Sequence, residues 1–411
     1  MIRSITIGLP LGAQAPAQID EQLAGLLRSA RSVMAEAGLT PRTTRLTLPA
    51  VDAAGEVAGS ILSSLRWVDE LASAHGIRWF CLPLDFVAEG ARRERLAAAL
   101  DAIGRFPRMF LNMMIADEGR IAPAAAADAA GLVLKVARKA NNGFDNFRVG
   151  ASCNCPPNAP FFPFSRHAGG IMAFSFALET TGIALEATQN CGADLTLVRE
   201  RVVAALVPKL QAINEIGLRL QQASGAEYRG LDASLAPFPD GKMSVAALIG
   251  RLGSPPGSAG SVMITALLTD ALRAALLQSG AKAVGFNGVM FSLLEDERLA
   301  RANNMRGLNL DALVSLAAVC GCGIDMVPLA GLVFQEEVAA LMLDVAALSS
   351  TLRKPLGVRV LPIPGRGVNE FTQFNLDFLC DSRIMDIGAV ERTPATARHL
   401  LQFQVPVADR S

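Results

Sequence analysis

The chain lacks an excess of charge of either sign. Lys and Arg together number 38 and so do Asp and Glu, which gives a formal net charge of zero at pH 7. Proteins that bind nucleic acids or anionic membranes usually carry a basic surface, which this balance does not provide. Charged residues make up only 18% of the 411, whereas 51% are hydrophobic. This composition excludes a disordered chain and favours one large α/β core or two smaller ones.

Long hydrophobic runs are also lacking. The longest uncharged stretches, 149–165 and 252–269, are interrupted by prolines and glycines, whereas a membrane-spanning helix needs about 20 consecutive apolar residues. The opening MIRSITIGLP alternates and does not form the apolar block of a signal peptide. The seven cysteines, an odd number, are scattered, which is typical of reduced thiols. We therefore expect a cytoplasmic protein with neither a membrane partner nor a nucleic-acid partner.

Common cofactor motifs are missing as well. The sequence contains no G-x-G-x-x-G after its first strand, no phosphate-binding G-x-x-x-x-G-K-[ST], no H-E-x-x-H and no G-x-S-x-G. Two C-x-C pairs, Cys153/Cys155 and Cys320/Cys322, do not have the C-x2–4-C spacing of structural zinc sites. The cofactor is therefore unknown, and no metal site is predicted.

What the sequence does contain is a regular alternation of apolar strands with amphipathic helices. Residues 2–9, 43–49, 79–87 and 108–115 are typical of strands, and helical periodicity follows each of them. Helices are predicted at 54–75, 91–103 and 194–223, and further strands at 283–293 and 324–329. The alternation ends with a last strand at 357–363, and the count reaches about ten strands. Such alternation indicates a mostly parallel sheet covered by helices. The alternatives are a (β/α)8 barrel with two misassigned strands and an open doubly wound sheet.

Few residues could serve as a catalytic base, because there are only three histidines. His75 ends a predicted helix, and a structural role there is favoured; His399 lies in a tail with no clear pattern. His167 follows a long loop rich in Pro and Phe at the end of a strand, where functional residues concentrate. His167 is therefore the candidate general base, with a structural hydrogen bond as the alternative.

Three other residues suggest chemistry by their position. Cys320 ends an apolar helix before a glycine-rich turn, so it is a candidate nucleophile, with simple packing as the alternative. Asp232 and Asp325 lie inside apolar runs, where a carboxylate must be hydrogen-bonded, paired or functional. The acids Glu295 and Asp296 begin a helix, where the helix dipole favours negative charge.

Four blocks of sequence resemble the DUF711 family, also called UPF0210. They are LDASLAPFPDGKMSVAALIGRLG, GFNGVMFSLLEDE, LNLDALVSLAAVCGCGIDMVPL and GVRVLPIPG, in that order. The opening RSITIGL and the segment APFFPFSRH are similar to further family segments. The resemblance covers most of residues 2–365, is strongest from about 225 to 365, and identifies the chain as a divergent member.

The resemblance implies a pyruvate formate-lyase-like fold, a ten-stranded α/β barrel made of two five-stranded halves with a loop in its centre. We expect residues 1–365 to form this barrel, 366–411 to form a C-terminal extension packed on it, and the Cys320–Asp325 turn to supply the central loop. The tail lacks the R-V-x-G-Y stretch of glycyl radical enzymes. Radical chemistry is therefore not expected.

The predicted site combines both arguments. His167, Asp232, Cys320 and Asp325 are expected to converge on one cavity as catalytic residues. Residues at positions that match the family are expected to bind substrate, namely Pro160, Phe161, Ser234 and Gly288. We expect a non-radical enzyme that acts on a small polar metabolite, with a Cys/His mechanism. The alternative is a protein that binds or senses a small molecule without catalysis; whether the chain forms a homo-oligomer is left open.

Overall fold

The computed structural model describes residues 1–411 except 52–57, 88–91, 140, 193, 390–400 and 404–411. One continuous sheet contains nine strands in the order β8-β7-β1-β2-β3-β4-β6-β10-β9; a short strand, β5, also pairs with β4, and a second, β11, pairs with β5. The mixed α/β class predicted from the alternation is confirmed. The predicted beginnings of two helices, at 54 and 91, and the histidine at 399 fall outside the described residues.

The first half of the chain forms the centre of the sheet. Five strands run parallel there: β1 (Ile2–Gly8), β2 (Thr43–Thr47), β3 (Trp79–Asp85), β4 (Met109–Asp117) and β6 (Val149–Cys153). All but β2 are buried over nearly their whole length, as expected for strands that are covered on both faces.

The remaining strands divide between the two flanks of this central sheet. On one flank, β7 (Ala173–Leu178) pairs antiparallel with β1, and β8 (Glu227–Asp232) is parallel to β7. On the other flank, β10 (Leu356–Ile363) pairs antiparallel with β6, and β9 (Gly323–Ala330) is parallel to β10. The flanking strands therefore run opposite to the central five.

The predicted strand at 283–293 has a different form. It is not a regular strand, but three isolated parallel bridges join this segment to the outermost strands. Leu231 of β8 pairs with Ala283, Leu235 pairs with Val289, and Ser292 pairs with Asp325 of β9. Gly285, with φ of 87°, and Asn287, with φ of 49°, bend the segment between these bridges and prevent a continuous ladder.

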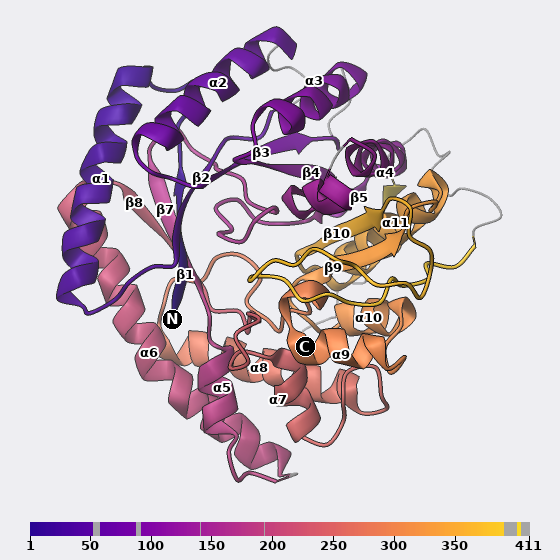
Figure 1. Ribbon diagram of the computed structural model, residues 1–411. Helices are drawn as coiled ribbons and strands as arrows, with labels where there is room; N and C mark the ends of the chain where they lie inside the picture. Colours follow the sequence, from indigo (N-terminus) through magenta and orange to yellow (C-terminus); the bar gives the residue numbers. More distant parts are fainter. Residues whose placement is uncertain (52–57, 88–91, 140, 193, 390–400, 404–411) are drawn as a thin grey trace.

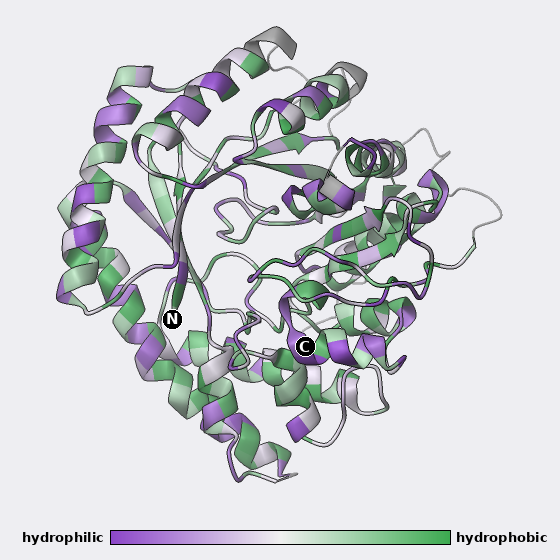
Figure 2. Ribbon diagram, in the orientation of Figure 1, coloured by the Kyte–Doolittle hydropathy of each residue, from purple (hydrophilic) through white to green (hydrophobic). Residues whose placement is uncertain are grey.

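Helices cover the outer face of the sheet (Figure 1). They are α1 (Pro16–Glu36), α2 (Ala58–Ala74), α3 (Arg92–Arg105), α4 (Pro123–Ala137), α5 (Thr181–Ala187), α6 (Leu195–Ser224), α7 (Val245–Arg251), α8 (Ser261–Ser279), α9 (Glu297–Asn304), α10 (Leu310–Ala317) and α11 (Gln335–Leu352). Figure 2 shows hydrophobic residues on the helix sides that face the strands and hydrophilic residues outside. The sheet and these inner faces form one large apolar core.

Local signals explain several helix ends. Asp194 caps α6 by accepting a hydrogen bond from the N–H of Leu197 at 3.0 Å, and Gly225 ends this helix in the left-handed region, with φ of 74°. In the described part of the chain one helix, α8, has the length and hydropathy that could cross a membrane, and half of the relevant window is buried inside the protein.

The C-terminal segment 366–389 packs against β9 and β10. Its Leu379 and Ile384 join Met326 and Leu361 in a separate apolar cluster, and the N–H of Met385 donates to the carbonyl of Pro328 at 2.9 Å. These contacts attach the segment to the last two strands of the sheet.

Candidate functional site

The long connection between β6 and β7, residues 154–172, crosses the inner face of the sheet. Thr6 of β1 donates a hydrogen bond to the carbonyl of Pro160 at 2.9 Å, and Cys81 of β3 donates to the carbonyl of Pro163 at 3.1 Å. Asn112 of β4 donates to the carbonyl of Ser165 at 3.4 Å. This connection therefore fills the interior; the Cys320–Asp325 segment, expected there, instead ends in strand β9.

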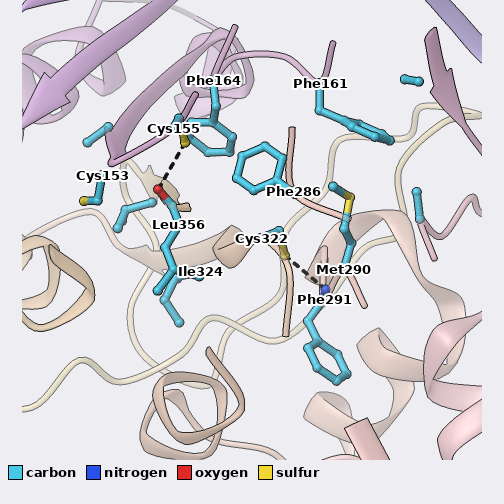
Figure 3. Close-up of a cluster of buried hydrophobic side chains, with 14 of the residues drawn as sticks. Cys153, Cys155, Phe161, Phe164, Phe286, Met290, Phe291, Cys322, Ile324 and Leu356 are labelled. Carbon is cyan, nitrogen blue, oxygen red and sulfur yellow. Dashed lines mark hydrogen bonds between the residues drawn. The ribbon is translucent and has the colours of Figure 1, made fainter. Parts of the chain in front are cut away.

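Phe164 fixes the connection in place. A Cβ atom added at either Gly150 of β6 or Gly357 of β10 would come within 2.6 Å of Cε1 of this ring, so both positions require glycine. The ring also packs against Phe286, with centroids 5.9 Å apart (Figure 3). The aromatic side chain is thus held between two strands and the irregular segment 283–292.

A cavity of about 70 Å³, measured as the space open to the centre of a water molecule, lies beside this connection. Charged residues from five parts of the chain reach it: Arg3 from β1, Arg45 from β2, Glu295, Asp325 from β9 and Arg359 from β10. Aromatic side chains form most of the remaining wall: Trp79, Phe110, Phe147, Phe161, Phe162, Phe164 and Phe286.

Most of these charges are paired. Arg359 donates two hydrogen bonds to the carboxylate of Asp325, from Nε at 2.6 Å and from Nη2 at 2.8 Å. Arg3 donates to Glu295 at 3.0 Å, and Arg359 lies 3.5 Å from the same carboxylate. Burial acts to raise the pKa of Glu295, but the two guanidinium groups outweigh it and lower that pKa. Glu295 is therefore ionised at neutral pH.

Arg45 differs from the other two arginines. Its Nε donates to Thr43 Oγ1 at 3.0 Å, and its guanidinium lies 5.2 Å from the centre of the Phe162 ring. Among the described residues no carboxylate lies within ion-pair distance of it. Burial and the neighbouring Arg3 lower the pKa of Arg45 to about 9, so it still carries its charge at neutral pH.

The cysteine that faces the cavity is Cys322, whereas Cys320 is fully buried behind it. The sulfur of Cys322 accepts a hydrogen bond from the N–H of Phe291 at 3.3 Å (Figure 3), and Cys320 accepts from Gly323 at 3.4 Å. A hydrogen bond from the Cys322 thiol lowers the pKa of Cys320 and raises that of Cys322. The two sulfurs thus share a proton, as coupled groups do.

Lys354 adds a positive charge near this thiol pair. Its ammonium donates to the carbonyl oxygens of Ala317 and Ala318, at 3.0 and 3.2 Å, and to that of Cys320. Burial lowers the pKa of Lys354. Its hydrogen bonds satisfy the last carbonyls of α10, so its first role is to cap that helix.

Asp232 has four hydrogen-bond donors around its buried carboxylate. It accepts from the hydroxyl and N–H of Ser234 at 2.5 and 3.0 Å, and from the N–H groups of Phe286 and Asn287 at 2.7 and 3.2 Å. Burial raises its pKa to about 6, although these bonds oppose the change. Ser234 also binds the N–H of Gly288. Asp232 and Ser234 therefore shape the 283–292 segment.

The imidazole of His167 packs directly against the backbone of Gly8 in β1. A Cβ atom on residue 8 would overlap this ring. Nδ1 is 3.2 Å from Asn158 Oδ1, which assigns the proton to Nδ1 and leaves the lone pair of Nε2 without a partner among the described residues. Burial lowers the pKa of His167 to about 4. The imidazole is therefore neutral at physiological pH.

The structure brings only some of the predicted site residues together. Phe161 and Asp325 line the cavity. Gly288 belongs to the bent segment next to the cavity, and Pro160, Asp232 and Ser234 contact that segment. A Cβ on Gly285 would approach Pro160 Cδ to 3.2 Å and would overlap Asp232. The hydrogen bonds of His167 and Cys320 do not include each other. Convergence of the four catalytic candidates stays a prediction.

Arginines are what the sequence reasoning missed. Arg3, Arg45 and Arg359 each occupy a strand position in an apolar or alternating run, which is the same signal that singled out Asp232 and Asp325. The prediction based on charged residues inside strands included only carboxylates. Extended to arginine, it would have identified all three. Within the described residues no group of three or more His, Cys, Asp or Glu side chains is placed to hold a metal ion.

Comparison with known proteins gives a consistent result. The family model "Uncharacterised ACR (DUF711)" matches residues 1–377. A UPF0210 protein of Pyrobaculum arsenaticum is 30% identical over 385 residues, which cover 90% of this chain and 84% of that protein. A UPF0210 protein of Desulforudis audaxviator is 27% identical over 398 residues, covering 91% of this chain and 88% of the relative. None of these names states an activity.

Proposed function

Because this chain belongs to the DUF711 family, which is described only as uncharacterised, we propose its function from the cavity itself. The protein acts as a non-radical enzyme on a small polar metabolite, and the metabolite binds between Arg45, Glu295 and Arg359. The supporting observation is that five ionisable side chains meet in an otherwise apolar interior. Charged groups are costly to bury, and such clusters occur most often at functional sites.

Groups suited to chemistry line the same space. Glu295 and Asp325 are carboxylates held by arginines, and Cys322 presents a thiol whose proton is shared with Cys320. This arrangement supports acid–base or thiol chemistry. A Cys/His mechanism through His167 remains a prediction, because a nucleophile and its base must come within about 3 Å.

The proposal includes a closed barrel of the pyruvate formate-lyase-like type. The segment 283–292 would be its tenth strand, and the bridges to both outer strands support this. The arrangement of five central strands with antiparallel flanks supports two five-stranded halves. We assign residues 1–365 to the barrel and 366–411 to an extension, in a cytoplasmic protein; the packing of Leu379 and Ile384 against the last strands supports the extension.

Incubation with a metabolite extract, followed by mass spectrometry, tests the proposal. The wild-type protein should retain a compound and convert it into a second one. Ala236→Leu, which adds three carbons to a residue that lines the cavity, should abolish both effects. Arg199→Gln, which changes an exposed ion pair with Asp270, is the control and should retain both. Conversion that survives Ala236→Leu would show that the reaction occurs elsewhere.

A binding or sensing protein is the second candidate, since the same ion network could hold a ligand without chemistry. The extract experiment separates the two functions. A single compound that is recovered unchanged, and is lost in Ala236→Leu, identifies a binding protein. A pair of interconverted compounds identifies an enzyme.

A further inference from the structure

The charges around the cavity do not balance. Three guanidinium groups line it, those of Arg3, Arg45 and Arg359, against the two carboxylates of Glu295 and Asp325. A further pair, Arg42 and Glu179, lies next to Arg3, and the charge of the Cys320/Cys322 thiol pair is matched by Lys354. Arg3 and Arg42 share Glu179 at 3.5 and 2.9 Å, and Arg3 and Arg359 share Glu295. Asp325 forms an ion pair with Arg359. The group left over is Arg45.

Arg45 lines the cavity, and most of its N–H donors have no acceptor among the described residues. A guanidinium has five N–H donors, and in the described structure only Nε has a hydrogen-bond acceptor, Thr43 Oγ1 at 3.0 Å. The four N–H groups on Nη1 and Nη2 have none. Arg3 is a nearby like charge that disfavours the charged form of Arg45. An anion placed against Arg45 would supply the missing acceptors and offset this repulsion.

The excess of a single positive charge favours a ligand with one negative charge. The residues that line the cavity determine what the rest of that ligand must be. Seven of the lining residues are aromatic, so a ligand must present apolar surface to them. A carboxylate offers two coplanar oxygens that match the guanidinium fork. Phosphate carries about 1.5 negative charges at neutral pH, and it would place oxygen atoms against aromatic rings that offer no hydrogen-bond donors.

The size of the cavity limits the ligand further. A cavity of about 70 Å³ by this measure has room for roughly five to seven water-sized groups, at about 10–15 Å³ each. The ligand is therefore small, with a carboxylate at one end and a short branched or flat apolar group at the other.

We propose that the cavity binds a small monocarboxylate with an apolar body, and that Arg45 is the residue that anchors its carboxylate. This inference rests on the proposed function, because it names the ligand class of the same cavity. It assigns Arg45 a binding role that is separate from the paired charges of Arg359 and Asp325.

Titration calorimetry with matched probes tests the inference. The probes are acetate, 3-methylbutanoate and benzoate, each compared with its neutral amide, and inorganic phosphate. At least one carboxylate should bind, and its amide should bind at least tenfold more weakly, as should phosphate. Arg45→Gln should weaken carboxylate binding at least tenfold, Arg45→Lys should restore part of it, and the surface variant Arg199→Gln should match the wild type.

The outcomes separate the inference from the proposed function. Amides that bind as tightly as the acids, phosphate that binds more tightly than they do, or unchanged affinity in Arg45→Gln would overturn the carboxylate assignment. If no carboxylate binds while the extract experiment yields a neutral compound lost in Ala236→Leu, the proposed function stands and this inference fails. If nothing binds in either experiment, both fail.

Discussion

The neutral state of His167 gives a prediction about acid stability. In the folded protein burial lowers the pKa of His167 from 6.5 to about 4. Above pH 6.5 the imidazole is neutral in both the folded and the unfolded chain. As the pH falls through 6.5 the unfolded chain takes up a proton that the folded protein does not. The free energy of unfolding therefore falls until the pH reaches about 4.

The size of this effect follows from the two pKa values. Each pH unit of displacement corresponds to about 1.4 kcal/mol, so a displacement from 6.5 to about 4 corresponds to about 3 kcal/mol. His167→Gln cannot titrate, and it keeps a polar side chain next to Asn158. Between pH 7 and pH 4 the wild type should lose about 3 kcal/mol more of its free energy of unfolding than His167→Gln loses.

Urea unfolding at half-unit steps between pH 4 and pH 7, followed by tryptophan fluorescence, measures this difference. His75→Gln is the matched control, because His75 lies at a helix end on the surface, 2.6 Å from the exposed Asp20. Parallel stability curves for the wild type and His167→Gln would refute the reasoning. They would mean that the imidazole accepts a proton in the folded state as easily as in the unfolded chain.

Three further outcomes are expected. Burial raises the pKa of Asp232 from 3.8 to about 6. Its contribution therefore lowers the free energy of unfolding by about 2 kcal/mol as the pH rises from 4 to 6, and Asp232→Asn should lack this decline in the same titration. Gly357→Ala should cost about 2–3 kcal/mol in thermal or urea unfolding because its Cβ would strike an aromatic ring. Gly25 lies inside helix α1, and a Cβ there would have its nearest neighbour 3.9 Å away. Gly25→Ala should therefore stabilise the protein by about 0.5–1 kcal/mol. Equal effects of the two glycine substitutions on stability would contradict the packing argument. Under native conditions iodoacetamide should modify Cys322, which lines the cavity, before Cys320, and peptide mass spectrometry showing the reverse order would contradict the placement of the two thiols.

Much of the fold could be predicted because strands and helices leave periodic signals. The predicted helix at 194–223 and the predicted strand at 324–329 agree closely with α6 and β9. The short strands β5 and β11 were missed because two-residue pairings have no period to detect. The strand expected at 283–293 was wrong as a regular strand, because Gly285 and Asn287 adopt positive φ.

The site was harder to predict because spacing in the sequence does not determine which side of the sheet a loop covers. The long loop was predicted to carry a functional residue, but its path across the inner face depends on contacts with β1, β3 and β4, which the sequence does not reveal. Cys320 was predicted as the nucleophile because it ends an apolar helix before a glycine-rich turn, whereas it is Cys322, two residues further along, that lines the cavity. Which of two cysteines two residues apart lines the cavity, and which is buried, depends on side-chain packing. A sequence motif does not contain that information.

The strand order has a consequence for how the chain folds as it is synthesised. The five central strands can pair as soon as they emerge, because β2, β3, β4 and β6 each join the central strand that was made just before them. One edge of that sheet, β1, is covered soon afterwards by β7. The opposite edge, β6, waits for β10, which begins about 200 residues further along the chain. Until then β6 exposes unpaired N–H and C=O groups to any other strand nearby. The nascent chain should thus be most prone to aggregation, and most dependent on chaperones, between the synthesis of these two strands.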